Sequence, residues 1–388
     1  MGETGTVRDD LAEGVSFGLE DVNEVLAAMV WEQAVERPRD GELMTCRLGL
    51  DGESPETLTM LGARFEVSRD RARQLYTRAV GNMVRYAQAT GAFDLGVFAE
   101  RYPVGWGDER LVRTLLGETY ATDTDIAAQD WSYLKLRLAG HDLQDAKRMA
   151  GFVFQRIAGW QQKGRWHLLP PVHPEEVPAG IWNPWLRRVE WGEGTAAALP
   201  ATPARTIDLA DDSRGTMFSE KLARETTFDT ALQARLFRLL DGSDQVDSFC
   251  EFPTPVTYDV DGSERIHYPT AAARFTDGRT ALIDVVPLGH VAFHVQRARA
   301  AAGRAYAHSH GWGWLVWTGS ATGVADLATR AVDSHAENIL RNRLASAPMT
   351  WPDLTAYRAE TGIELLDLAA LVLRHNWRWD RAPFRLTR

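Results

Sequence analysis

Residues 47–86 read RLGLDGESPETLTMLGARFEVSRDRARQLYTRAVGNMVRY, and this stretch decides the fold of the N-terminal part of the chain. A short helix is predicted over Thr57–Arg64, because apolar residues recur there at helical spacing. The tripeptide Glu66-Val67-Ser68 predicts a turn, and Ser68 is a preferred N-cap for a second helix. That second helix would bury one stripe of small and apolar residues: Ala72, Leu75 and Ala79.

The opposite face of the second helix carries side chains that suit DNA: Arg69, Arg71, Arg73, Gln74, Thr77 and Arg78. Arginine and glutamine on the first turns of such a helix can reach phosphates and the donor and acceptor edges of the major groove. The pattern therefore predicts a helix-turn-helix over residues 57–85 that binds double-stranded DNA. The alternative is a solvated, arginine-rich helix in an ordinary helical domain.

The same stretch resembles region 4 of the sigma-70 family. The resemblance rests on Arg-Leu-Gly-Leu-Asp-Gly at 47–52, Thr-Leu at 57–58, Leu-Gly at 61–62 and Val-Ser-Arg-x-Arg-x-Arg-Gln at 67–74. It implies a helix-turn-helix that reads the promoter −35 element and touches the flap of RNA polymerase. The sequence shows no counterpart of the sigma region that melts the −10 element, so a complete sigma factor is not expected.

Composition limits the partners. The chain of 388 residues has a net charge of −10, which argues against a nonspecific coat for nucleic acid. Between Gly62 and Tyr86, however, six arginines face only Glu66 and Asp70. Cys46 and Cys250 form no disulfide or metal pattern, and no apolar run approaches the roughly 18 residues of a membrane span. The sequence predicts a cytoplasmic, nucleoid-associated protein with no membrane partner.

The predicted fold class is multidomain, α and α/β. We expect a flexible N-terminus at 1–20, a helical domain at 21–168, a Pro/Ala-rich connection at 169–214 that is flexible near 196–203, an α/β domain at 215–320 and a C-terminal domain at 321–388. An amphipathic helix is predicted over Asp21–Arg37. Four tryptophans of the helical domain are expected in its core, with base stacking as the alternative: Trp106, Trp131, Trp160 and Trp166.

The α/β domain has a recognisable order of elements. The sequence predicts a helix, two strands, a hairpin, a helix and a strand: Phe228–Leu240, Ser248–Tyr258, Glu264–His267, Ala271–Phe275 with Ala281–Val286 around Thr276-Asp277-Gly278, Ala292–His308 and Trp312–Thr318. This order resembles the core of PD-(D/E)XK nucleases, and 228–318 is similar to TnsA-type transposase endonucleases. The resemblance implies a restriction-endonuclease-like fold.

The catalytic positions of that family are mostly replaced. Such nucleases hold Mg²⁺ with acidic side chains and use a lysine to activate water. The matching positions here are Gln233, Thr270 and Val286, and only the vestigial Asp284 remains. The resemblance therefore implies a degenerate nuclease without catalytic residues or cofactor. The alternative is that other acids restore a Mg²⁺ site: Glu225, Asp229, Glu251 or Asp259.

Histidines and arginines near the 292–308 helix are candidate binding groups. His290 and His294 have a spacing that could present two imidazoles to zinc, but no third ligand is evident. Arginines on this helix could face DNA phosphates, although an exposed helix face predicts them equally well: Arg297, Arg299 and Arg304.

The C-terminal residues predict a second DNA reader. A capping box at Thr350 opens a helix that Gly362 ends, and Glu364–His375 forms the next helix. Residues 376–379 and 383–387 predict a two-stranded wing, and the whole resembles the winged-helix tail of TnsA-like proteins. The secondary DNA-binding residues would be Arg374, Arg378, Arg381 and Arg385. The alternative is a helical cap on the sheet.

These patterns favour a non-catalytic, sequence-specific DNA-binding protein that acts in transcription regulation or on a mobile or terminal DNA element. Two alternatives remain open. One is the endonuclease subunit of a TnsA-like heteromeric transposase, with Mg²⁺ and a partner subunit. The other is a sigma-like interaction protein that binds RNA polymerase.

Overall fold

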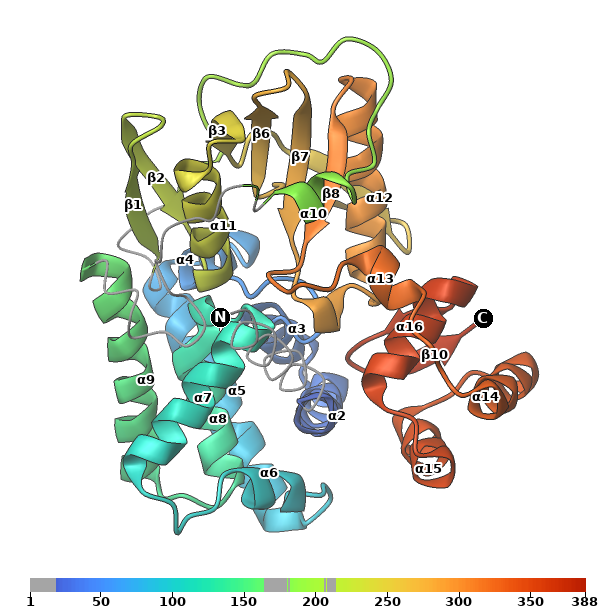
Figure 1. The fold of residues 1–388 in the computed structure, drawn as a ribbon. Helices are drawn as coiled ribbons and strands as arrows, with labels where there is room; N and C mark the ends of the chain where they lie inside the picture. The colour runs from blue at the N-terminus through green and yellow to red at the C-terminus, as the bar shows by residue number, and fades with distance from the viewer. Residues whose placement is uncertain (1–18, 164–179, 181, 206, 208–213) are drawn as a thin grey trace.

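The computed structural model describes residues 19–163, 180, 182–205, 207 and 214–388, with the backbone alone at 160–163. It combines a helical half, a mixed sheet with flanking helices and a C-terminal helical module (Figure 1). The predicted mixture of α and α/β structure is therefore present. Within the described ranges, no helix has the length and apolar character that crossing a bilayer requires. The expected flexible N-terminus falls outside the described residues up to position 18.

Most helices of the helical half contribute to an apolar core that continues into the α/β half. Its elements are α2 Glu20–Glu36, α3 Pro38–Leu48, α4 Leu58–Arg64, α5 Arg69–Thr90, α6 Gly96–Arg101, α7 Asp108–Thr122, η1 Asp125–Ala127, α8 Ala128–Leu138 and α9 Leu143–Lys163. The amphipathic helix expected from position 21 is α2, which buries the predicted face at Val22, Leu26 and Met29.

The α4–α5 pair forms as the sequence predicts. Thr57 Oγ1 accepts a hydrogen bond from the Met60 amide at 3.2 Å, and Ser68 Oγ accepts one from the Arg71 amide at 3.2 Å. These caps satisfy N–H groups that an α-helix leaves unpaired at its start. Ala72, which was predicted to be buried on the second helix, forms a small apolar cluster with Leu58 and Leu61 of α4.

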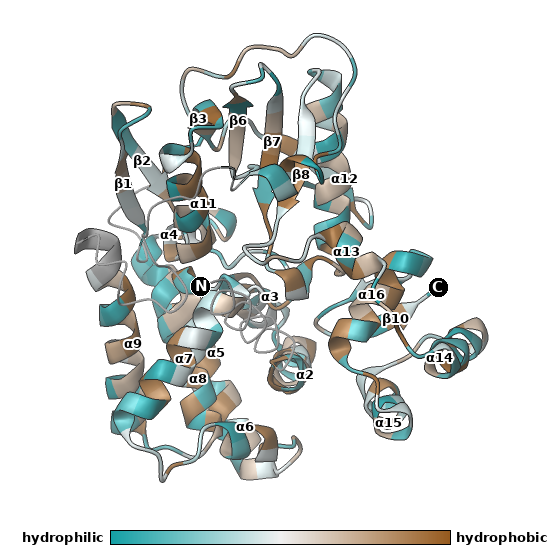
Figure 2. Ribbon diagram, viewed as in Figure 1, coloured by the Kyte–Doolittle hydropathy of each residue, from teal (hydrophilic) through white to brown (hydrophobic). Residues whose placement is uncertain are grey.

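A four-stranded sheet forms the centre of the α/β half. The strands are β3 Val246–Glu251, β6 Ala271–Phe275, β7 Thr280–Val285 and β8 Gly313–Trp317, in the order β3-β6-β7-β8. Only β7 and β8 are parallel, because α12 His294–Ser309 crosses between them. All of β7 is buried, and apolar residues run along much of it (Figure 2).

Helices cover both faces of this sheet. Ala273 and Phe275 share a core with α11 Ala231–Gly242, whereas Ala272 belongs to a cluster with Ala307 of α12. This alternation is the two-residue period of a strand buried on both sides. The predicted helix, strand, hairpin, helix and strand are thus present in the expected order.

Two predicted boundaries are wrong. The strand expected over Ser248–Tyr258 ends at Glu251, because Phe252 has a φ of 44° and Pro253 and Pro255 follow. Proline lacks the N–H that a strand ladder needs. The helix expected from Phe228 begins at Ala231, since Thr230 is its N-cap.

Two separate hairpins flank the sheet. One strand of the second hairpin was predicted, over Glu264–His267, and the first hairpin was not predicted. The first joins β1 Gly215–Ser219 and β2 Arg224–Phe228. The second joins β4 Val256–Val260 and β5 Ser263–His267.

The described part of the 169–214 connection lies against the α/β half. After α10 Asn183–Leu186, Glu190 and Trp314 exchange two backbone hydrogen bonds of 3.0 and 2.9 Å at the edge of β8. The carbonyl of Ala197 accepts a hydrogen bond from Trp312 Nε1 at 2.9 Å. The stretch near 196–203, expected to be flexible, is therefore held at Ala197 by the sheet. The prolines expected to break structure at 170–178 lie outside the described residues.

The C-terminal module contains α13 Val324–Ala328, α14 Ser334–Ser346, α15 Trp351–Thr361, α16 Leu365–His375, β9 Arg378–Asp380 and β10 Arg385–Thr387. The predicted capping box joins Thr350 and Asp353, and β9 pairs with β10. A bridge between Met349 and Leu386 adds a third extended segment. The two predicted helices and the hairpin are therefore confirmed.

Candidate nucleic-acid interface

The predicted DNA-reading residues of α5 lie on one exposed face. All six are exposed in the structure: Arg69, Arg71, Arg73, Gln74, Thr77 and Arg78. Arg71 Nη1 donates to Gln74 Oε1 at 3.2 Å, and Arg78 lies 3.9 Å from the Asp40 carboxylate of α3. The first turns of α5 thus keep a polar, cationic surface that could reach a nucleic acid.

A further cation beside this face was missed by the sequence reasoning. Arg39 of α3 stacks 5.6 Å from the Phe65 ring and donates to the Phe65 carbonyl at 3.1 Å. It is exposed next to the turn between α4 and α5. No local pattern pointed to it, because it comes from a helix that precedes the pair.

The four C-terminal arginines do not form the basic surface that was expected. Arg381 is buried, with its side chain 6% exposed, and pairs with Glu20 of α2 at 3.0 Å. Arg378 pairs with Asp261 of the β4–β5 turn and with Asp380, each at 2.7 Å. Asp380 is close to these arginines in sequence, whereas Glu20 and Asp261 come from distant parts of the chain.

The other two predicted C-terminal arginines, Arg374 and Arg385, lie in different surroundings. Arg374 binds the Glu337 carboxylate at 2.9 Å and the carbonyls of Ala328 and Arg330. Arg385 is exposed on β10. Of the predicted secondary DNA-binding set, Arg385 is therefore the one that the structure leaves on the surface without a described ion pair.

Two of the four tryptophans that were expected in the core of the helical half have described side chains, and both make contacts within the protein. Trp131 is 5% exposed and donates from Nε1 to the Leu48 carbonyl at 3.1 Å. Trp106 stacks 3.5 Å from the guanidinium of Arg110. The side chain of Trp160 and all of Trp166 lie outside the described residues.

A cleft of about 940 Å³ lies between the helical half and the sheet. Its lining includes three of the four positions that the nuclease resemblance puts together: Gln233, Thr270 and Asp284. The fourth, Val286, is buried and donates its amide to the Trp317 carbonyl. It faces a separate, smaller cavity.

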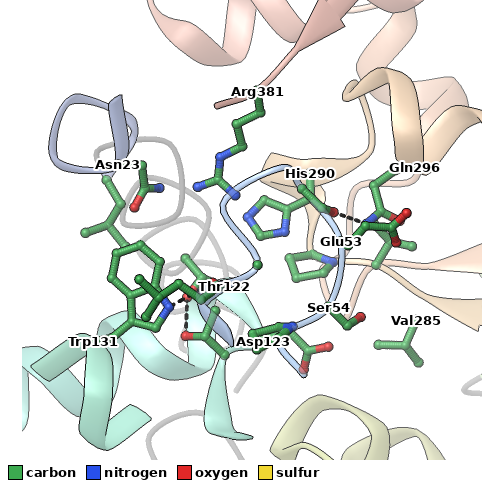
Figure 3. Close-up of a pocket in the computed structure, with 18 of the residues that line it drawn as sticks. Asn23, Glu53, Ser54, Thr122, Asp123, Trp131, Val285, His290, Gln296 and Arg381 are labelled. Atoms are coloured by element: carbon green, nitrogen blue, oxygen red, sulfur yellow. Dashed lines mark hydrogen bonds between the residues drawn. The ribbon is translucent and has the colours of Figure 1, made fainter. Parts of the chain in front are cut away.

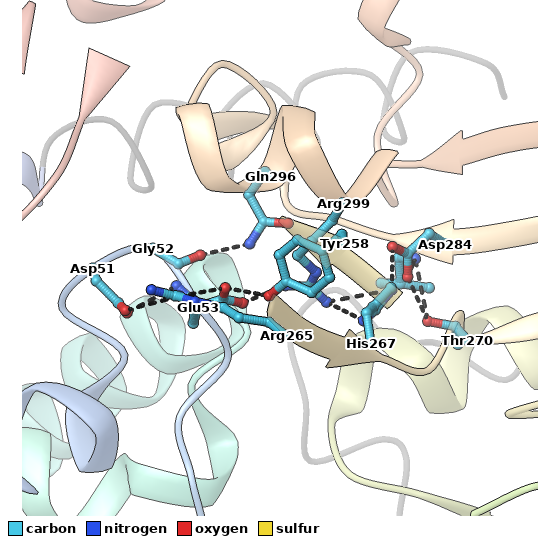
Figure 4. A network of polar contacts seen from close by, with 11 residues as sticks. Asp51, Gly52, Glu53, Tyr258, Arg265, His267, Thr270, Asp284, Gln296 and Arg299 are labelled. Carbon is cyan, nitrogen blue, oxygen red and sulfur yellow. Dashed lines mark hydrogen bonds and ion pairs between the residues drawn. The ribbon is translucent and has the colours of Figure 1, made fainter. Parts of the chain in front are cut away.

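Asp284 is fully engaged at the floor of this cleft (Figure 4). His267 Nε2 lies 2.7 Å from Asp284 Oδ2, and Thr270 Oγ1 donates to Oδ1 at 3.3 Å. Burial alone would raise the pKa of the Asp284 carboxyl, but His267 and Arg299 outweigh it and hold the pKa below its usual value.

His267 connects this carboxylate to α12. Arg299 Nη2 lies 2.6 Å from His267 Nδ1, and an arginine can only donate. Nδ1 therefore accepts, and the Nε2–H donates a hydrogen bond to the Asp284 carboxylate. Burial and then the charge of Arg299 lower the pKa of His267, which favours the neutral ring. Neither ring nitrogen is left to act as a base.

Of the acids that could restore a metal site, only Asp229 lines the cleft with Asp284. It is paired with Arg205 at 2.8 Å and with Arg214 at 3.0 Å. Glu251 is buried in a pair with Arg224, Glu225 is exposed, and Asp259 accepts from the Gly262 amide. Within the described ranges, no three His, Cys, Asp or Glu side chains are grouped as metal ligands.

The proposed zinc pair does not share a helix. His290 ends η3 Leu288–His290, and His294 is the first residue of α12. Burial lowers the pKa of His290 to about 3, and its ring stacks on Phe293 at 5.1 Å. The spacing argument therefore fails, because it assumed one continuous helix.

His290 lines the smaller cavity, of about 40 Å³, which lies where the three parts of the molecule meet (Figure 3). Arg381 enters it from the last hairpin, and Asp123 and Trp131 line it from the helical half. Such a volume suits a few water molecules at roughly 10–15 Å³ each, and is too small for a nucleotide.

The loop between α3 and α4 supplies residues that no sequence pattern pointed to. Glu53 of this loop enters the cleft and accepts hydrogen bonds from Tyr258 Oη and, at 2.9 Å, from Arg265 Nη1. It also lies 3.3 Å from Arg299 Nη1. Gly52 has a φ of +91°, and a Cβ there would lie 3.1 Å from Val295 of α12, so the loop approaches the helix closely.

The arginines of α12 that could have faced DNA are turned to other contacts. Arg297 donates to the Trp377 carbonyl and Arg304 pairs with Glu190. Arg299 is buried, 7% exposed, at the cleft.

Searches against protein-family models, curated proteins and solved structures found no match to this chain.

Proposed function

We propose that this chain is a non-catalytic, sequence-specific DNA-binding protein that acts in transcription regulation or on a mobile or terminal DNA element. The observation that carries the proposal is the α4–α5 pair. It has a capped turn, a buried apolar seam and a face on which six DNA-compatible side chains are exposed together. Those features are what a helix-turn-helix needs in order to present its second helix to the major groove.

The charge distribution supports binding through one patch. The chain carries a net charge of −10, whereas the start of α5 is locally cationic. Arginines near phosphates supply affinity, and Arg71 with Gln74 offers donors and an acceptor to base edges. Because the rest of the surface is acidic, binding should weaken steeply as salt rises.

The side chains at the positions that the nuclease resemblance puts together support a non-catalytic role. Val286 is buried and apolar, so it cannot position or activate water. Gln233 uses its Oε1 to accept the Asp229 amide at 2.9 Å, and both oxygens of Asp284 accept from neighbouring groups. The chain therefore keeps the nuclease-like core as a scaffold in this proposal.

One observation favours the endonuclease alternative. Asp229 and Asp284 line the same cleft, and Asp123 of the helical half joins them there. Burial, together with the charges of Asp229 and Asp284, raises the pKa of Asp123 to about 7. A Mg²⁺ site would need these carboxylates freed from their present arginine and histidine partners.

The C-terminal module is proposed as a winged helix with a structural role. Its order of helix, extended segment, two helices and hairpin is that of a winged helix: α14, Met349, α15, α16, β9 and β10. Its hairpin arginines are largely used for contacts with the rest of the chain. RNA polymerase as a partner of the α4–α5 pair stays a prediction from the sigma resemblance.

The direct test is selection from a random duplex library with the purified chain, followed by genome-wide mapping of bound DNA. The proposal expects one enriched motif in both experiments, with binding that falls steeply between low and physiological salt. Recovery of unenriched DNA would contradict sequence-specific readout. Cleaved products in the selection would instead favour the endonuclease.

A further inference from the structure

The cleft contains an anion-binding arrangement that the DNA-binding proposal does not use. Three side chains surround the Glu53 carboxylate: Tyr258, Arg265 and Arg299. Two guanidinium groups and a phenol are also the groups that bind phosphate oxygens in proteins. Although burial alone would raise the pKa of Glu53, the charges of Arg299 and Arg265 and the Tyr258 hydrogen bond hold it below its usual value.

Arg299 is held in place by residues outside the loop. Arg299 is 7% exposed and is fixed by His267, which in turn is fixed by Asp284. The Nε of Arg299 is buried and has no hydrogen-bond partner among the described residues. Arg265 and Tyr258 stand on the paired strands β5 and β4, at matching positions of the hairpin. A guanidinium held by its neighbours loses little freedom when an anion binds.

The two walls of the cleft have opposite formal charges. The α/β wall contains four arginines and three acids: Arg205, Arg214, Arg265 and Arg299, with Asp229, Glu264 and Asp284. The helical wall contains five acids and one arginine: Glu42, Asp51, Glu53, Glu56 and Asp123, with Arg64. The helical wall therefore covers and neutralises a wall that would otherwise be weakly cationic.

We propose that Tyr258, Arg265 and Arg299 form a phosphate-binding site and that the Glu53 carboxylate occupies it as a built-in competitor. The phosphate is a phosphodiester of DNA, and this identification of the source rests on the proposed DNA-binding function. The site itself does not depend on that function. Entry of a phosphate requires the 49–56 loop to withdraw Glu53, and this loop leads directly into α4.

The site is tested first with inorganic phosphate. Thermal unfolding is measured for the full chain and for Glu53→Gln at increasing phosphate, with chloride at matched ionic strength as reference. Phosphate should raise the melting temperature of Glu53→Gln and leave the wild-type chain and Glu53→Gln/Arg265→Ala unchanged. Glu264→Gln is the matched control. Glu264 is exposed on β5 and lines the same cleft, so its substitution removes one negative charge there as Glu53→Gln does.

The proposal is overturned if phosphate does not stabilise Glu53→Gln. It is also overturned if phosphate stabilises Glu264→Gln and the wild-type chain as much as it stabilises Glu53→Gln. Circular dichroism of each variant confirms that it is folded. Should Arg265→Ala impair folding in the double variant, Tyr258→Phe in the Glu53→Gln background removes one donor and should reduce the phosphate effect.

DNA binding then identifies the source of the phosphate. The slope of log affinity against log salt is measured on one duplex, and Glu53→Gln should steepen it by about 0.9 for each phosphate gained. The gain should persist in the Arg71→Ala/Arg73→Ala background, since it does not involve α5. Stabilisation by phosphate with an unchanged slope supports the site and assigns it to a free phosphate or nucleotide. Failure of the α5 variants to affect DNA binding would count against the proposed function alone.

Discussion

Arg381, close to the C-terminus, lies with its Nη2 3.0 Å from Oε1 of Glu20, the first residue of α2. Their side chains are 6% and 3% exposed, so the pair is buried. Beside it, Glu24 accepts a hydrogen bond from the Phe384 amide at 3.0 Å. The last hairpin therefore docks on the first described helix.

The Arg381–Glu20 contact should contribute strongly to stability. Removing one partner of a buried pair leaves an uncompensated charge, which costs about 3–5 kcal/mol. Arg381→Ala should lower the free energy of unfolding by this amount in urea titrations. Arg385→Ala, an exposed arginine of the same hairpin, is the control and should change little. Equal effects of the two variants would mean that the contact is not a structural tie.

DNA readout by α5 gives the second prediction. Arg71→Ala and Arg73→Ala should each weaken binding to a selected duplex, by about 1–3 kcal/mol and with relaxed specificity where a base contact is lost. A phosphate contact would instead weaken all sequences alike. Fluorescence anisotropy on selected and scrambled duplexes separates the two cases.

The control for that experiment is Arg113→Ala with Arg341→Ala. Both arginines are exposed on other helices, α7 and α14, and the double change removes the same charge. If Arg71→Ala/Arg73→Ala binds the selected duplex like this control, α5 is not the reading helix.

Local patterns predicted the elements well. The α4–α5 pair, the β6–β7 hairpin and α15–α16 follow from capping residues, turn residues and apolar spacing within short windows. At the end of β3, Pro253 and Pro255 are a local signal against a continuing strand, and the predicted strand overran it. The positive φ of Phe252 has no local signal. Tertiary context imposes it.

The contacts between distant segments could not be predicted in the same way. Glu53 meets Arg265 and Arg299 across more than 200 residues of sequence. A single sequence shows charges but not which of them pair, so Arg378 and Arg381 resembled a free basic tip. The same holds for the packing of distant elements, because residues of α2, α8 and α11 belong to one apolar cluster.

The nuclease-like core should not cut DNA. Supercoiled plasmid and target-containing duplex incubated with the purified chain in Mg²⁺ or Mn²⁺ should remain intact. Under the proposed nuclease resemblance, Val286 and Gln233 take the places of a lysine and an acid. Asp284→Asn, which keeps the shape of the side chain, is tested in parallel. Cutting by the wild-type chain that is lost in Asp284→Asn would contradict the prediction and support the endonuclease.

Glu24 provides a prediction about pH. Burial, and then the charge of Glu20, raise its pKa from 4.5 to about 8, although the Phe384 amide and Arg381 lower it in part. The folded chain therefore keeps a proton on Glu24 in a pH range where the unfolded chain has lost it. Between pH 4.5 and about 8 the free energy of unfolding therefore falls as the pH rises, by at most about 1.4 kcal/mol per pH unit. Above about pH 8 the stabilisation that the raised pKa of Glu24 contributes at low pH is completely lost.

Glu24→Gln removes this titration while keeping a similar side chain. Relative to the wild-type chain, its free energy of unfolding should therefore increase as the pH is raised from 5 to 8 and then level off. Urea unfolding at several pH values measures the difference, and subtraction removes the contributions of other buried acids such as Asp123 and Asp125. Glu32→Gln is the matched control, because Glu32 is exposed on the same helix. A difference between wild type and Glu24→Gln that stays constant with pH, or one that Glu32→Gln reproduces, would show that Glu24 is not the group that carries the proton.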